Sequence, residues 1–230
     1  MILCHRYKFI FLKTNKTAGT SVEIALSKFC GEGDIVTPLS QDDEATRRRL
    51  GHGESRNYLA PAGEYGLRDV ARLLIKGRRK RRFYNHITAG EVMRMIPREI
   101  WDGYYKFCFE RNPWDRVMSL YYARYRSEPR PSVAEFLASE TVLELKKRGI
   151  GVYTVDGRVV VDKICRYENL AEELAAVGKA LGLPEALQLV RAKSGYRRDA
   201  GRYADILSAE EKAEIGRLFR PEIDLFGYSC

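Results

Sequence analysis

The 230-residue sequence has no paired cysteines and no long apolar run, and each absence excludes a class of protein. Its five cysteines are scattered, odd in number and in no CxxC pair. They predict no disulfide framework, and we interpret them as reduced thiols of a cytoplasmic protein. No apolar run approaches the ~18 residues of a membrane-spanning helix, so we expect no membrane span. The start, Met1–Arg6, is too short for a signal peptide, so we expect none.

The sequence also lacks an internal repeat, a linker and a low-complexity tract. A chain of this length fits one α/β domain and can bury a sizeable core. Residues 31–66 are rich in Gly, Asp, Arg and Pro and show weak periodicity. We interpret this stretch as an insertion or loop region.

The charge balance is basic. The 40 Lys and Arg residues outnumber the 31 Asp and Glu residues, and the net charge of +9 suggests an anionic partner without naming it. Six of the cations stand in residues 76–82, which we call the basic run. Such a run is typical of a solvated face, or of a nucleic-acid or localisation patch.

Hydrophobic periodicity and turn residues predict alternating strands and helices. The predicted strands are residues 7–12, 104–109 and 163–167, and an Asp-Gly turn predicts a hairpin over residues 152–161. The predicted helices are residues 20–29, 67–75, 88–96, 113–126, 132–148 and 169–181, then a short helix to residue 190 and another after residue 208. This alternation predicts an α/β fold in which helices cover a parallel sheet.

The segment between the first strand and the first helix has the composition of an anion-binding loop. It consists of Lys16, Thr17, Ala18, Gly19, Thr20 and Ser21. Backbone N–H groups at a helix N-terminus are unpaired and carry partial positive charge. The small residues let an anion approach the backbone, Lys16 adds a mobile cation, and the hydroxyl residues add donors. A phosphate or sulfate group fits this design, and the alternative is an ordinary strand-to-helix turn.

A second candidate clamp follows the strand at residues 104–109. Arg111 stands at the end of the strand and Ser119 two helical turns later. A guanidinium fork and a hydroxyl can converge on one phosphate. The alternative is that Arg111 pairs with Asp115 or Glu110, and that Ser119 is simply a small helix residue. The residues alone leave both interpretations open.

Three segments resemble, in order, those of sulfotransferases that use 3′-phosphoadenosine 5′-phosphosulfate (PAPS). Lys-Thr-Ala-Gly-Thr-Ser at residues 16–21 resembles their 5′-phosphosulfate loop, although Asn15 stands where proline is common. Arg-Asn-Pro-x-x-Arg-x-x-Ser-x-Tyr from Arg111 resembles their 3′-phosphate-binding segment. Arg-Tyr-Glu-Asn-Leu from residue 166 is similar to the segment whose tyrosine lies near the donor's adenine. The tail, residues 196–228, resembles the closing segment of the family that includes many bacterial and carbohydrate sulfotransferases.

The resemblance spans nearly the whole chain apart from about residues 31–80. It therefore implies one sulfotransferase-like domain over residues 1–230, with a variable insertion at about 31–80. The implied fold is a P-loop-like three-layer domain with a central, mostly parallel sheet flanked by helices. PAPS would be the co-substrate, with residues 16–21 at its 5′ end and Arg111 and Ser119 on its 3′-phosphate. Tyr167 and Arg197 would be further donor contacts, and no metal is implied.

The resemblance implies transfer of a sulfuryl group to an acceptor hydroxyl, and it assigns two catalytic roles. Lys16 can neutralise charge on the leaving oxygen. His86, between the donor motifs, is the candidate base that takes the acceptor's proton. Glu91 is the first alternative, and a core or capping role for His86 stays open. If the basic run lines the acceptor cleft, it would attract an anionic acceptor such as an acidic glycan.

Two other function classes compete with this one. A P-loop kinase would need the GxxxxGK[ST] pattern, but here the lysine precedes the glycine, and no Mg²⁺-binding aspartate is evident. A non-catalytic nucleic-acid binder would depend on the basic run, but the chain shows no recognised binding module. We therefore expect a donor nucleotide and an acceptor as partners, and no specific nucleic acid.

Overall fold

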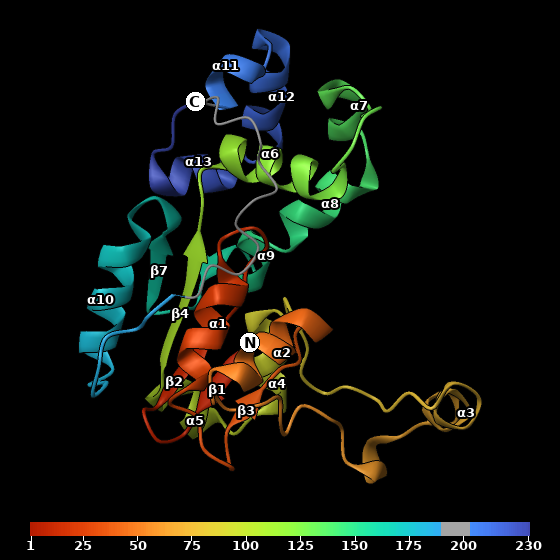
Figure 1. Cartoon of the computed structure of the whole chain (residues 1–230), viewed down its shortest axis with the longest axis vertical. Helices are drawn as coiled ribbons and strands as arrows, with labels where there is room; N and C mark the ends of the chain where they lie inside the picture. The colour runs from red at the N-terminus through yellow and green to blue at the C-terminus, as the bar shows by residue number, and fades with distance from the viewer. Residues whose placement is uncertain (190–202) are drawn as a thin grey trace.

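The computed structural model describes residues 1–189 and 203–230 as an α/β protein built on a five-stranded sheet of order β3-β1-β2-β4-β7 (Figure 1). The strands are β1 (Ile2–Cys4), β2 (Phe9–Phe11), β3 (Ile35–Val36), β4 (Tyr105–Glu110) and β7 (Lys163–Arg166). β2 is parallel to β4 and β4 to β7, whereas β1 is antiparallel to both β2 and β3. The predicted α/β class is confirmed, but the sheet is mixed rather than mostly parallel.

The antiparallel half of the sheet comes from two short strands that the sequence pattern does not reveal. β1 has three residues and β3 has two. Alternation is recognised over about four to eight residues, so neither strand carries a pattern of its own. Ile2–Cys4 is nevertheless buried along its whole length, because β1 has a neighbour on each side.

The helices fill the connections between the strands. Before β4 lie α1 (Gly19–Ser27), α2 (Gln41–Arg49), η1 (Ala62–Glu64), α3 (Leu67–Lys76), α4 (Ala89–Met95) and α5 (Arg98–Gly103). Between β4 and β7 lie α6 (Pro113–Arg124), α7 (Val133–Leu137), α8 (Glu140–Lys147), α9 (Ile150–Tyr153) and the hairpin of β5 (Thr154–Val155) and β6 (Arg158–Val159). After β7 lie η2 (Tyr167–Asn169), α10 (Leu170–Ala180), α11 (Tyr203–Ile206), α12 (Ala209–Leu218) and α13 (Arg220–Phe226).

Alternating side chains of the strands build an apolar cluster on each face of the sheet. One set faces α1 and α10, and its strand members include Phe9, Phe11, Phe107 and Phe109. The opposite set faces α4, α5 and α9, and its members include Ile10, Leu12 and Cys108. Helices therefore cover both faces of the central strands.

A third apolar cluster lies beyond the carboxyl end of β4. It joins α6, α7 and α8 to α12, and Figure 1 shows these helices at one end of the molecule. Trp114 of α6 and Phe219 after α12 are both buried in it. This packing fixes the start of α6, which begins two residues after Arg111.

Several predicted elements differ from the observed ones. Residues 31–66, predicted as a loop region, contain β3 and α2, which Ser40 caps through its side chain. The single helix predicted over 132–148 is two helices, α7 and α8. The hairpin predicted over 152–161 is present with its turn at Asp156 and Gly157, where φ is 49° and 74°. It is shorter than predicted, because residues up to Tyr153 belong to α9. Residues 183–189 form no helix, although a short one is predicted there.

Candidate functional site

The parallel strands bring the predicted donor segments to one edge of the sheet. β2, β4 and β7 are parallel neighbours, so their carboxyl ends lie along the same edge. β2 leads into the loop that ends at Gly19, β4 leads to Arg111, and β7 leads to Tyr167. Ligands of open α/β sheets bind outside the carboxyl ends of the strands. The topology therefore gathers segments that are distant in sequence where a ligand can bind.

The loop between β2 and α1 holds two residues with side chains in the left-handed backbone region. φ is 67° at Lys16 and 59° at Ala18. Such conformations cost on the order of 1–3 kcal/mol each and cluster at functional sites. Ala18 is the N-cap of α1, and among the described residues no side chain caps this helix and no acid stands in its first turn. The positive end of α1 therefore meets the loop without a side-chain anion.

Gly19 lets the loop pass close over the Lys13 side chain. A Cβ on Gly19 would lie 2.7 Å from Lys13 Cγ. Lys13 Nζ is itself 2.7 Å from Glu23 Oε2, and both side chains are buried. Burial opposes ionisation of Glu23, but Lys13 and the N-terminal amine outweigh it and lower the pKa of that carboxyl to about 2. Lys13 therefore neutralises Glu23 beneath the loop.

The hydroxyl residues of the loop differ in their surroundings. Thr17 is buried with its Oγ1 2.7 Å from Thr14 Oγ1, and the Thr14 hydroxyl donates to the Phe109 carbonyl. Thr17 therefore braces the loop against β4. Thr20 is half-buried and Ser21 is buried in the first turn of α1, and within the described structure neither hydroxyl makes a hydrogen bond. The hydroxyls of Thr20 and Ser21 are therefore better placed than that of Thr17 to donate hydrogen bonds to a bound anion.

Arg111 connects the three segments. Its Nη1 donates to the Lys16 carbonyl oxygen at 3.0 Å, and its guanidinium lies 4.1 Å from the centre of the Tyr167 ring. Its Nε also donates to Asp115 Oδ2 at 2.8 Å, so the pairing with Asp115 that the sequence leaves open is present. Ser119 is half-buried on α6, one helical turn beyond Asp115. A phosphate at this point would share Arg111 with Asp115.

Arg116 supports the loop from the interior of the molecule. The side chain is fully buried, Nε donates to the Asn15 carbonyl at 3.1 Å, and Nη1 lies 2.8 Å from Glu110 Oε1. A Cβ on Gly149 would lie 2.1 Å from Arg116 Nη2, so any larger residue there would have to displace the guanidinium. Arginine is rarely fully buried, so a sequence pattern places it at the surface. Its signal was its place in the Arg-Asn-Pro-x-x-Arg segment.

His86 lies beside the loop in a tautomer suited to accept a proton. Its Nδ1 is 2.9 Å from the Lys13 carbonyl oxygen. A carbonyl only accepts, so Nδ1 carries the hydrogen and Nε2 is the basic nitrogen. Burial, followed by the charge of Lys13, lowers the pKa of His86 to about 4. The ring is therefore neutral at pH 7, held in an uncommon backbone conformation with φ of 63°.

The alternative base, Glu91, is engaged at the start of α4. Its Oε2 accepts from Thr88 N at 3.0 Å and from Thr88 Oγ1 at 2.7 Å, and its Oε1 accepts from the Tyr84 hydroxyl. Burial raises the pKa of Glu91, but the hydrogen bonds from Tyr84 and Thr88 outweigh it, so the net shift is downward. The pKa of both candidates is lowered, which weakens each of them as a base, so the hydrogen bonds decide between them. Both oxygens of Glu91 are already bound, whereas the bond from His86 to Lys13 uses only Nδ1, so the geometry favours His86 over Glu91.

Other predicted features are not brought to this edge. Arg197 lies outside the described residues. The basic run follows α3, which Figure 1 shows well away from α1 and from the end of β4. A pocket of about 520 Å³ lies beside α6, α12 and α13, with Trp114, Arg217 and Ile223 in its lining, and none of the predicted site residues borders it.

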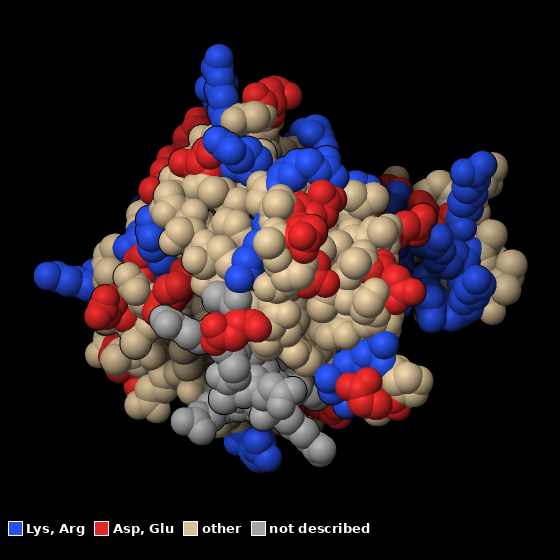
Figure 2. Space-filling model, turned by 90° about the horizontal axis from the view of Figure 1, so that it is seen from above, with Lys and Arg blue, Asp and Glu red and all other residues tan. Residues whose placement is uncertain are grey.

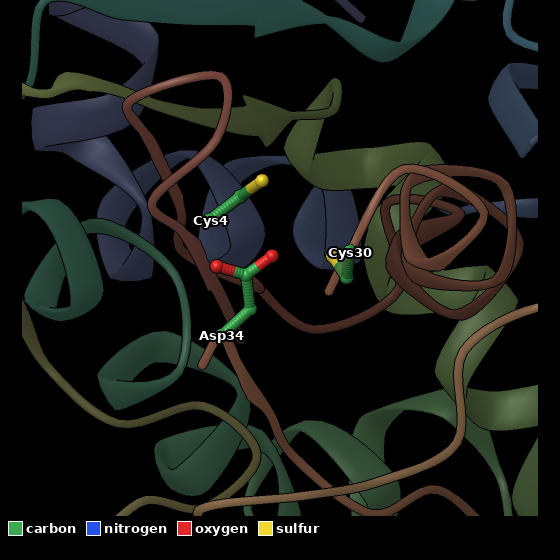
Figure 3. A group of neighbouring side chains, drawn as sticks. All are labelled: Cys4, Cys30 and Asp34. Atoms are coloured by element: carbon green, nitrogen blue, oxygen red, sulfur yellow. The ribbon is translucent and has the colours of Figure 1, made fainter. Parts of the chain in front are cut away.

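One group of side chains has atoms of the kind that bind metal ions. These sulfur and oxygen atoms lie within 4.8 Å of one another, and they belong to Cys4, Cys30 and Asp34 (Figure 3). Cys4 pairs with Phe9 at the start of β2, so the group lies at the opposite edge of the sheet from the loop. Asp34 accepts two backbone N–H bonds, at 2.6 and 2.7 Å, and each thiol donates to a backbone carbonyl. The contact with Cys4, followed by burial, raises the pKa of the Cys30 thiol. We interpret the group as the closure of a turn by hydrogen bonds to the backbone.

The described ranges contain no helix with both the length and the apolar character that crossing a bilayer requires. No protein-family model and no solved structure gives a significant match to the chain. A protein of Archaeoglobus fulgidus, described as uncharacterized, is 38% identical over 120 residues. The match covers 49% of this chain and 98% of the archaeal protein. At this identity and coverage, the chain belongs to the same family as that archaeal protein, whose description names no activity.

Proposed function

We propose that the chain is a PAPS-dependent sulfotransferase that moves a sulfuryl group from PAPS to an acceptor hydroxyl. The observation that carries the proposal is the double contact of Arg111, which donates to the Lys16 carbonyl and stacks on Tyr167. An ordinary strand-to-helix turn would not need contacts to the segments of both Arg111 and Tyr167. Helices on both faces of the sheet also fit the P-loop-like three-layer domain that the resemblance implies.

The donor would lie along the carboxyl edge, with its phosphosulfate at the start of α1. The first-turn N–H groups, the Thr20 and Ser21 hydroxyls and the Lys16 ammonium would be its partners there. The 3′-phosphate would meet Arg111 and Ser119, with Arg111 shared with Asp115, and the adenine would lie near Tyr167. The mixture of backbone N–H groups, hydroxyls and cations suits a ligand with two separate anionic groups.

The reaction would transfer one sulfuryl group and one proton. The acceptor oxygen attacks the sulfur, a new S–O bond forms, and the bond from sulfur to the bridging phosphate oxygen breaks. Adenosine 3′,5′-bisphosphate leaves, and Lys16 with the N-terminal end of α1 stabilises its charge. Nε2 of His86 takes the acceptor's proton, because Nδ1 is held by the Lys13 carbonyl.

Calorimetric binding of adenosine 3′,5′-bisphosphate tests the proposal, with ATP and duplex DNA as the competing ligands. We expect the bisphosphate to bind much more tightly than either, because ATP lacks the 3′-phosphate for Arg111. Arg111→Ala should weaken binding by about tenfold or more, since a hydrogen bond to a charged group is worth about 1.5–3 kcal/mol. Arg124→Ala, at an exposed arginine near the end of α6, is the matched control. Equal affinity for ATP and the bisphosphate would contradict the proposal.

Turnover requires the acceptor, which a screen with labelled donor and a mass-spectrometric readout can identify. With that acceptor, Lys16→Ala should lower kcat by about 10²–10³, as loss of one donor to the developing charge does. Lys28→Ala removes a lysine at the opposite end of α1, where Lys28 pairs with Glu185, and should leave kcat unchanged.

A further inference from the structure

Helix α3 presents an apolar face that no described residue covers. None of its residues is buried, and the exposed fractions of Leu67, Leu74 and Ile75 are 92%, 79% and 79%. Figure 1 shows the helix projecting from the body of the molecule on two extended connections. Single exposed apolar residues are normal, but a contiguous exposed group marks an interaction site.

The spacing of residues puts the apolar side chains of α3 on one side. At about 100° per residue, an arc of roughly 200° holds only apolar residues. Its members are Leu67, Val70, Ala71, Leu73, Leu74 and Ile75. The remaining arc holds Arg68, Asp69, Arg72 and Lys76, three of which are basic. A helix with one apolar face and one basic face has the composition of helices that lie in the plane of a membrane surface.

The basic run continues the positive charge directly after the helix. Arg78, Arg79 and Arg81 are exposed, and none of them has an ion-pair partner among the described residues. Lys80 instead lies 2.9 Å from Asp69, which ties the run back to the helix. Figure 2 shows Lys and Arg gathered on the projecting lobe. The apolar face therefore adjoins a surface that favours anions.

We infer that α3 and the basic run form a membrane-surface anchor that binds a bilayer containing anionic lipid. Charge complementarity identifies the occupant, because the bilayer offers acyl chains to the apolar arc and lipid headgroups to the arginines. An acidic polysaccharide or nucleic acid would leave the leucines in water. A second copy of the chain would bring the same positive charge against itself. The inference uses no residue of the proposed sulfotransferase site.

Co-sedimentation of the full chain with lipid vesicles tests the anchor. We expect binding to vesicles of phosphatidylcholine and phosphatidylserine at about a 2:1 ratio, little binding to phosphatidylcholine alone, and loss of binding as salt screens the headgroups. Leu74→Asp should weaken partitioning by about tenfold or more, because a leucine-sized contact with the acyl region is lost. Arg78→Ala combined with Arg79→Ala should weaken it by about 30-fold, since each cation near the surface contributes about fivefold.

Matched controls lie elsewhere on the surface. Leu143→Asp changes a leucine of α8 that is 50% exposed, and Arg124→Ala combined with Arg158→Ala removes two exposed arginines. These variants should bind vesicles as the wild type does. All the substituted side chains are exposed, so thermal midpoints should stay unchanged.

A fluorescence measurement reports the depth of the helix. Both native tryptophans are buried, Trp101 at 6% exposure and Trp114 at 7%, so Leu74→Trp adds a distinct exposed probe. Its emission should shift to shorter wavelength on addition of the mixed vesicles. Failure of the wild type to bind mixed vesicles, or undiminished binding by Leu74→Asp, would overturn the inference. So would a concentration-dependent dimer that Leu74→Asp abolishes while vesicles bind neither protein, because it would assign the face to a second copy.

Discussion

His86 and His52 make the same kind of hydrogen bond, but they differ in what lies beside them. Nδ1 of His52 is 2.8 Å from the Ile24 carbonyl, and Nδ1 of His86 is 2.9 Å from the Lys13 carbonyl. Both rings are half-buried. Ile24 lies inside α1, whereas Lys13 lies at the start of the candidate loop. The two histidines therefore differ in what they adjoin: His52 lies against α1, and His86 lies beside the loop, where we propose that it accepts a proton.

His86→Ala should lower the rate of sulfuryl transfer by about 10²–10⁴, the usual worth of a positioned base. It should leave the affinity for adenosine 3′,5′-bisphosphate unchanged, because the donor contacts come from other segments. A base acts only when neutral, and the pKa of His86 is lowered to about 4. The wild-type rate should therefore rise with pH through about 4 and be constant near neutrality. A pH–rate profile with the identified acceptor measures both effects.

His52→Ala is the matched control and should keep the wild-type rate and profile. If His86→Ala also kept them, the proton would go to another group, and Glu91→Gln would be the next variant. A rate that instead rises through pH 6–7 would mean that the ring is more solvated during turnover than in the free protein.

At the scale of elements, the sequence predicts best where periodicity is long. β4, α3 and α10 lie close to their predicted ranges because each spans several turns or a continuous apolar run. β1 and β3 are too short to show a period. α2 is mostly charged, so its only helix signals are its cap and charge order. Its packing against α1 is not revealed by any local pattern.

The sequence likewise predicts some features of the candidate site and not others. The order of the motifs predicts which segments meet, because each follows a parallel strand. The choice of partner for Arg111 is not predictable, since Asp115 and a phosphate offer the same fork geometry. The need for Gly149 is also hidden, because it arises only when the turn between α8 and α9 meets Arg116.

Gly149→Ala tests that contact. The added methyl would lie 2.1 Å from Arg116 Nη2, and the guanidinium cannot move without breaking its bonds to Glu110 and Asn15. We expect a loss of about 1–3 kcal/mol in the free energy of unfolding, the usual cost of overpacking. Urea denaturation measures it. Gly151→Ala, in α9 with nothing within 4 Å of its added Cβ, should be neutral or slightly stabilising. Equal stability of the two variants would show that Arg116 is not held in this position.

On the scale of the whole molecule, one buried arginine links β4 to α13. Arg116 Nη1 lies 2.8 Å from Glu110 of β4 and 3.9 Å from Glu222 of α13. All three side chains are fully buried. One cation cannot neutralise two carboxylates, so one of them is expected to hold a proton. Burial, followed by the charge of Glu110, raises the pKa of Glu222 to about 7.

This raised pKa predicts a pH-dependent stability. The pKa of Glu222 is about 7 in the folded protein against the ordinary 4.5, so between these values the folded state binds more protons than the unfolded state. Raising the pH through this window therefore lowers the free energy of unfolding, by about 3 kcal/mol in total. His86 acts in the opposite direction between pH 4 and 6.5, because its folded pKa is lowered.

These effects overlap with that of the Met1 amine, whose pKa is lowered by burial from 8.0 to about 6, so only a difference between wild type and variant isolates Glu222. Urea denaturation of wild type and Glu222→Gln between pH 4.5 and 8 measures that difference. Glutamine stays neutral at every pH, so the wild type should lose about 3 kcal/mol relative to the variant as the pH rises, with no further change above about pH 8. Arg116 would then be paired with Glu110 alone at low pH and with two carboxylates at high pH. A difference that does not vary with pH would show that Glu222 keeps one charge state throughout, and the buried proton would have to be sought on Glu110.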